Sequence, residues 1–170
     1  MAIITLNNNS LTNITSLPTG VGGKVLQVVS AIKTDTQSLA GDWTDISGLS
    51  VSITPSSTSN KILVLAHITT SSTNHGHTRC VRGSTVIGAG VASGSRGAVS
   101  GYANANGNTA RVYAFSYLDS PNTTSATTYK FQLESNNGAT SYINQTPNDT
   151  DAIYGSRSSS TITVMEISAW

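Results

Sequence analysis

Residues whose side chains branch at the β-carbon dominate this 170-residue sequence and limit the folds open to it. Val, Ile and Thr occur 49 times, whereas Glu, Lys, Arg and Gln together occur only 15 times. Branching at Cβ restricts χ1 in a helix but suits a pleated strand, so the sequence predicts an all-β protein. The many Ser, Thr and Asn residues first suggest disorder, but Leu, Ile, Val and Phe still make up 37 residues, enough for a modest core.

Strand-like segments separated by turn residues follow one another from Lys24 onwards. No segment between them shows a helical period, so a parallel sheet would lack the crossover helices that cover its faces. We therefore expect about eight antiparallel strands in a domain of residues 24–170, forming a two-sheet sandwich of jelly-roll type. Residues 88–110, rich in Gly and Asn, are expected to form a loop with at most one short strand. The predicted strand segments are 24–33, 49–54, 61–69, 77–81, 85–87, 111–118, 127–133, 140–144 and 161–168.

Residues 1–23 differ from the rest because they carry no charge and are too short to bury their own apolar side chains. They end in a glycine-rich stretch, which favours a hinge. We therefore expect an extended N-terminal segment that anchors the β-sandwich to another protein. The apolar residues expected to make this anchor are Ile3, Ile4, Leu6, Leu11, Ile14 and Leu17.

Charge is scarce and balanced, with nine basic and eight acidic residues and a formal net charge of +1. Scattered basic residues supply neither the cationic stripe that binds nucleic acid nor a polybasic membrane anchor. No apolar run approaches the ~20 residues of a membrane-spanning helix. Neither nucleic acid nor membrane insertion is therefore expected.

Sequence motifs for catalysis are missing. No serine has glycine at both the −2 and +2 positions, and Gly88-Ala89-Gly90 is not completed into a phosphate-binding pattern because residue 93 is Ser. Cys80 is the only cysteine, which rules out an intrachain disulfide, and it is expected to be a small buried residue. The acidic residues lie mostly in predicted turns, and nothing pairs two of them for glycoside hydrolysis. The chain is expected to be no enzyme and to need no cofactor.

His75-Gly76-His77 is the most specific local pattern. In an extended strand, residues i and i+2 point to the same face, so both imidazoles can reach one ion. If three chains met on an axis there, six nitrogens would surround the ion. The alternative, a polar loop ahead of Arg79, is preferred because Gly76 weakens the strand pattern. We therefore expect no metal site. His75 and His77 are the candidate ligands of the alternative in which a metal is bound.

Six stretches carry a resemblance to a known group of proteins. They are 23–29 (GKVLQVV), 48–57 (GLSVSITPSS), 59–64 (SNKILV), 82–88 (RGSTVIG), 117–121 with 123–129 (YLDSP, TTSATTY) and 160–167 (STITVMEI). In these stretches the chain resembles small virion structural or tail-fibre-like proteins of tailed bacteriophages, especially marine and cyanobacterial ones. The resemblance implies a trimeric knob or adhesin that an N-terminal segment joins to a larger part of the virion, and it transfers no catalytic residue.

Our hypothesis from the sequence is a bacteriophage virion protein, assembled in the host cytoplasm, that displays loops for attachment to a host-surface polysaccharide. Asn, Ser and Tyr supply hydrogen bonds and flat rings, and a homotrimer would add avidity. The partners expected are other virion proteins, through residues 1–23, and a host glycan. One alternative is a head-decoration or cement protein that stabilises the capsid without binding a receptor; another is a polysaccharide-degrading spike. The loop residues expected to contact the host are Arg96, Tyr102, Asn104 and Asn106.

Overall fold

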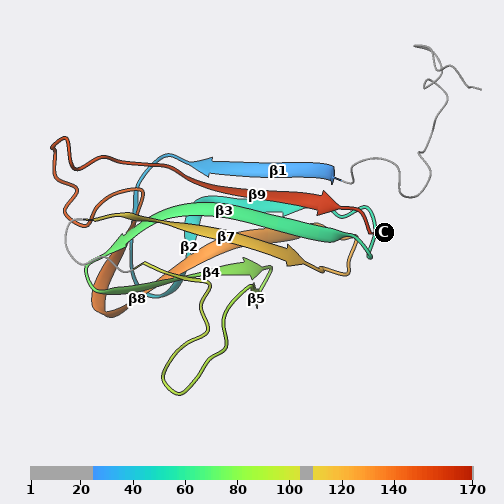
Figure 1. The fold of residues 1–170 in the computed structure, drawn as a ribbon, viewed down its shortest axis with the longest axis horizontal. Helices are drawn as coiled ribbons and strands as arrows, with labels where there is room; N and C mark the ends of the chain where they lie inside the picture. Colours follow the sequence, from blue (N-terminus) through green and yellow to red (C-terminus); the bar gives the residue numbers. More distant parts are fainter. Residues whose placement is uncertain (1–24, 104–108, 170) are drawn as a thin grey trace, which may run out of the picture.

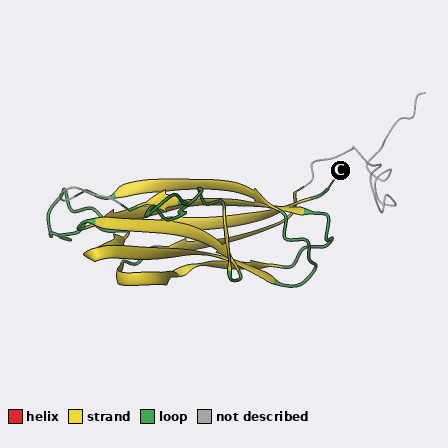
Figure 2. Cartoon of the chain, turned by 90° about the horizontal axis from the view of Figure 1, so that it is seen from below, coloured by secondary structure: helices red, strands yellow, loops and turns green. Residues whose placement is uncertain are grey.

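A computed structural model describes residues 25–103 and 109–169, which form two antiparallel sheets packed face to face (Figures 1 and 2). The described residues contain nine strands and no helix, so the predicted all-β sandwich is confirmed. The first sheet holds, in spatial order, β1 (Val25–Lys33), β9 (Ser160–Ile167), β3 (Lys61–Ser72) and β7 (Arg111–Asp119). The second sheet holds β2 (Gln37–Ile53), β8 (Thr127–Ile143), β4 (His75–Arg82) and an edge made of β5 (Thr85–Ile87) and β6 (Gly101–Tyr102).

The strand order makes this sandwich a jelly roll. Chain-order neighbours pass from one sheet to the other, except for β4, β5 and β6, which all lie in the second sheet. Each sheet mixes strands from the two ends of the chain. Such a crossed order gives two four-stranded sheets joined by connections over their ends. The two sheets also touch through hydrogen bonds between the last residues of β3 and the last residues of β8.

Alternating side chains of facing strands fill the space between the sheets. Tyr129, Phe131 and Leu133 of β8 are fully buried, because alternate residues of a strand point to the same face. Phe131 meets Phe115 of β7 edge to face, with ring centroids 5.3 Å apart. Fully burying a side chain of this size stabilises a fold by about 1.5–3 kcal/mol. β3, the strand predicted at residues 61–69, is central in the first sheet, because it pairs with β9 on one side and β7 on the other.

Two details of the predicted strand pattern are wrong. Residues 136–138 do not separate two strands; β8 continues through them, and Asn137 (φ 56°) and Gly138 (φ 68°) form a bulge. The bulge bends β8, so its first part pairs with β4 and its last residues pair with β3. Residues 37–48 also belong to β2, although Gly41 and Gly48 give this part of the sequence the character of a loop. Both glycines have positive φ values and lie at irregularities in the pairing of β2 with β8.

The expected anchor residues Ile3, Ile4, Leu6, Leu11, Ile14 and Leu17 lie outside the described residues. Within the described residues there is no helix of the length and apolar character needed to cross a membrane.

Candidate functional site

A thirteen-residue excursion interrupts one edge of the second sheet, and we call residues 88–100 the edge loop. The strands β5 and β6 on either side of it both pair with β4, at Cys80↔Ile87 and Thr78↔Gly101. They are therefore two parts of one edge strand. Gly88, with φ +59°, turns the chain out of the sheet. Figure 1 shows the edge loop projecting from the body of the sandwich below β4 and β5.

Backbone hydrogen bonds give the edge loop a defined shape. Gly90 donates its N–H to the carbonyl of Val99 at 3.1 Å, which closes the base of the loop. At its tip, Ser93 and Arg96 exchange two backbone hydrogen bonds of 3.0 and 3.1 Å around Gly94. Gly94 has a φ of +58°, a conformation that glycine adopts without strain. The tip is therefore a tight turn.

Ser100 attaches the end of the edge loop to both sheets. Its N–H donates to the carbonyl of Thr78 at 2.9 Å, and its Oγ accepts from the N–H of Cys80 and donates to the carbonyl of Ile87. Its carbonyl accepts the hydroxyl hydrogen of Tyr113, a residue of β7 in the first sheet. One residue thus fixes the edge loop against β4, β5 and β7.

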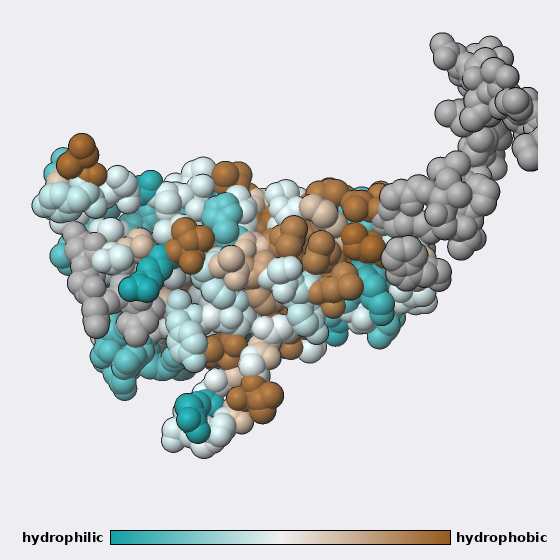
Figure 3. All heavy atoms as spheres, viewed as in Figure 1, coloured by the Kyte–Doolittle hydropathy of each residue, from teal (hydrophilic) through white to brown (hydrophobic). Residues whose placement is uncertain are grey.

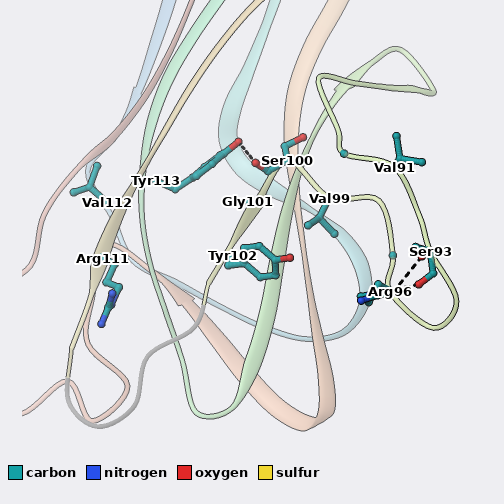
Figure 4. A pocket seen from close by; sticks show the side chains of 12 residues that line it. Val91, Ser93, Arg96, Val99, Ser100, Gly101, Tyr102, Arg111, Val112 and Tyr113 are labelled. Atoms are coloured by element: carbon teal, nitrogen blue, oxygen red, sulfur yellow. Dashed lines mark hydrogen bonds between the residues drawn. The ribbon is translucent and has the colours of Figure 1, made fainter.

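Between the edge loop and β7 lies an open depression of about 600 Å³, shown in Figure 4. It lies where the free edges of the two sheets approach each other, with β6 and the edge loop on one side and β7 on the other. None of the described residues that line it is acidic. The side chains that define its chemistry are Arg96, Arg111, Tyr102, Val91, Val99 and Val112.

Two of the predicted contact residues, Arg96 and Tyr102, are brought together at this depression. Asn104 and Asn106 lie outside the described residues. Sequence reasoning missed Arg111 and Val112, which begin the predicted strand 111–118 and gave no sign of which loop they would face. The exposed N-terminal end of that strand, carrying an arginine beside the loop-rich segment, was the available signal.

The five arginines of the chain fall into two groups. Three interact with another side chain of the protein. The Cζ atom of Arg79 lies 4.1 Å from the centroid of the Trp43 ring, Arg82 forms an ion pair with Asp119, and Arg157 forms one with Asp149. Arg96 and Arg111 form no ion pair with any described residue. Both line the depression, so it is a local concentration of positive charge in a nearly neutral protein.

The candidate metal ligands His75 and His77 lie in strand β4, so the preferred expectation of a polar loop there is wrong, and both share the solvent-facing side of the strand. His77 is engaged with other groups: its Nδ1 lies 2.9 Å from Oε1 of Glu134, and its ring meets that of Tyr102 edge to face. Among residues 25–103 and 109–169, no three His, Cys, Asp or Glu side chains are grouped as metal ligands. These observations do not test the alternative of a metal site shared by three chains.

The outer face of the first sheet carries an apolar row. Val28, Met165, Leu63 and Leu118 lie side by side on β1, β9, β3 and β7. Val28 and Leu118 are each 54% exposed. Figure 3 shows apolar surface gathered on this side of the molecule, toward the end where β1 begins.

Comparison with known proteins assigns no family to this chain. No protein-family model matches the sequence, and no curated protein sequence does. Among solved structures, a chain from the structure of infectious bursal disease virus Gt strain is similar over 84% of this chain, with 12% identity and a TM-score of 0.37. This chain spans 38% of the length of that one. A similarity at this level says nothing about function.

Proposed function

We propose that this chain is a virion surface protein of a tailed bacteriophage that attaches the particle to a host-surface glycan through the depression beside the edge loop. The observation that carries the proposal is the depression itself. It combines an exposed tyrosine, two arginines that form no ion pair within the described part of the chain and a hydrogen-bonded loop, all at one edge of the sandwich. The six stretches that resemble phage virion proteins supply the setting.

The chemistry of the depression suits passive binding. Tyr102 is 69% exposed and offers a flat ring, while the backbone groups of the edge loop and the side chain of Ser93 offer hydrogen bonds. Glycoside hydrolysis requires two carboxylates that flank the scissile bond. Since no carboxylate of residues 25–103 and 109–169 lines the depression, the proposal is attachment without cleavage.

The proposal includes a homotrimer joined to other virion proteins through residues 1–23. The apolar row on the first sheet supports contacts between copies, because it carries no charged side chain whose burial would oppose association. Three identical sites would raise the avidity of a weak single site.

Removing the tip of the edge loop tests the attachment function. Replacing residues 91–97 with two glycines keeps Gly90 and Val99, which already meet at the base of the loop. Phage carrying this variant is expected to assemble normally and to lose adsorption to host cells. Normal adsorption together with reduced heat resistance of the particles would instead identify a cement protein. New reducing ends after incubation with host capsule would identify a degrading spike.

A further inference from the structure

We infer that the depression binds an anionic saccharide, one whose carboxylate or sulfate groups pair with Arg96 and Arg111. The inference rests on the proposed attachment function and names the class of glycan that the same site takes. It starts from the contrast among the arginines: three are neutralised or stacked within the protein, and two face the depression with no described acidic partner.

Both arginines keep hydrogen-bond donors for a ligand. A guanidinium carries five N–H donors. Arg96 uses Nε on the carbonyl of Ser93 at 3.1 Å and Nη2 on Oγ of Ser93 at 3.2 Å, which holds its side chain in place and leaves three donors. The side chain of Arg111 donates to no atom of the described residues, so all five of its donors remain. A carboxylate or sulfate is the group that such planar forks bind best.

Tyr102 provides the surface for the sugar ring. Figure 4 shows its ring between the side chains of Arg96 and Arg111. The edge contact with His77, at 5.5 Å between ring centroids and 68° between planes, supports the tyrosine without covering it. Val112 is 64% exposed and adds apolar surface beside the ring. A sugar placed on Tyr102 therefore has a cationic group on either side.

The charges around the depression also favour an anionic ligand. Glu134, which lies opposite His77 in the β4–β8 register, is engaged by His77 at 2.9 Å. Within the described residues, nothing that lines the depression offsets the two positive charges. The hydrogen bonds that fix the edge loop at Ser93, Gly90 and Ser100 also limit the ordering cost of binding.

Binding of the 170-residue chain to immobilised polysaccharides tests the inference. The probes are polygalacturonate for carboxylates, dextran sulfate for sulfates, neutral dextran and a single-stranded oligonucleotide. Arg96→Gln and Arg111→Gln are each expected to weaken binding to at least one anionic polysaccharide about tenfold or more, as loss of a charge-assisted hydrogen bond predicts. The polysaccharide affected identifies the anionic group. Lys61→Gln is the control, because it removes the same charge at the opposite end of β3 from the pairing of Thr70 with Arg111.

The outcomes separate the inference from the proposed function. Anionic binding that is unchanged in both arginine variants, or that falls equally in Lys61→Gln, overturns the inference. So does an equal, arginine-dependent affinity for the oligonucleotide. If dextran or host cells bind in a manner that needs Tyr102 but neither arginine, the inference fails and attachment through the depression stands. If host-cell binding survives removal of residues 91–97, the attachment function itself fails.

Discussion

The ring of Tyr113 occupies the space that a side chain at Gly101 would fill. A methyl group on Gly101 would overlap the Tyr113 ring at Cε2, Cδ2 and Cζ. The same ring delivers its hydroxyl hydrogen to the carbonyl of Ser100, the residue before the glycine. The close approach of β6 and β7, which builds the depression, therefore depends on the absence of a side chain at position 101.

Gly101→Ala is expected to displace Tyr113 and break its hydrogen bond to Ser100. Overpacking of this kind costs about 1–3 kcal/mol of unfolding free energy and should also abolish saccharide binding at the depression. Urea denaturation and the polysaccharide-binding assay measure the two effects. Gly97→Ala is the matched control for the unfolding free energy, because a methyl group there meets no atom within 4 Å. Equal unfolding free energies of the two variants would show that the Gly101–Tyr113 contact has no role in stability.

Glu166 should make the stability of the fold sensitive to acid. Burial raises its pKa, but hydrogen bonds from Asn60, Gln27 and Ser56 outweigh burial and lower the pKa from 4.5 to about 2. The unfolded chain binds this proton more tightly, so the contribution of Glu166 is fully present above pH 4.5 and is lost as the pH falls through about 2.

Glu166→Gln is therefore expected to lower the unfolding free energy at pH 7 by about 1–3 kcal/mol. The difference from wild type should shrink as the pH falls from 4.5 toward 2, as measured by urea denaturation at several pH values. Asp42→Asn, at an exposed carboxylate, should have little effect. A difference that stays constant over this range would contradict the assigned pKa.

Asp119 joins the two sheets at the end of β7. Both of its carboxylate oxygens lie 2.8 Å from Arg82, and one accepts the hydroxyl hydrogen of Tyr129 at 2.7 Å. Asp119→Ala is expected to cost about 3 kcal/mol, because the variant leaves the partly buried Arg82 without its counter-charge. Asp45→Ala, which breaks an exposed pair with Lys130, should cost below about 1 kcal/mol. Similar thermal or urea transitions for the two variants would refute this ranking.

Cys80 should be unreactive in the folded protein. It is fully buried, as expected from the sequence, and burial together with the nearby Asp119 raises the pKa of its thiol to about 12. Because the thiolate is the reactive form, iodoacetamide at pH 8 should modify Cys80 only after addition of denaturant. Mass spectrometry of the intact chain measures the modification, and rapid labelling of the native protein would disprove the prediction.

The apolar row should hold the proposed trimer together. Val28→Asp and Leu118→Asp would each place a carboxylate in the contact, and light scattering should then give the mass of a monomer where the wild type gives a trimer. Ser52→Asp, on the solvent-facing side of β2 in the other sheet, is the control and should remain trimeric. A monomeric wild-type chain in solution, or variants that stay trimeric, would count against this interface.

Strands β2 and β8 show which parts of the structure a local sequence pattern predicts and which it does not. The alternation of Tyr129, Phe131 and Leu133 already predicts a buried face, because strand geometry alone decides which side chains share it. Residues 37–48 have no such alternation and become a strand only because β8 supplies hydrogen-bond partners on either side of the bulges. Likewise, no local signal at Asn137 or Gly138 indicates that β8 bends there and changes partner from β4 to β3.

By itself, the sequence determined the all-β class, most strand positions, the burial of Cys80 and the loop character of residues 88–100, because each depends on side-chain branching, alternation or turn residues close together in the chain. The tertiary structure decided the functional geometry. Arg96 lies in the edge loop beside the second sheet and Arg111 begins β7 of the first sheet. They share one depression only because the jelly-roll order brings the β5–β6 edge beside β7. Contacts between distant segments depend on strand order and register, which a local pattern does not encode.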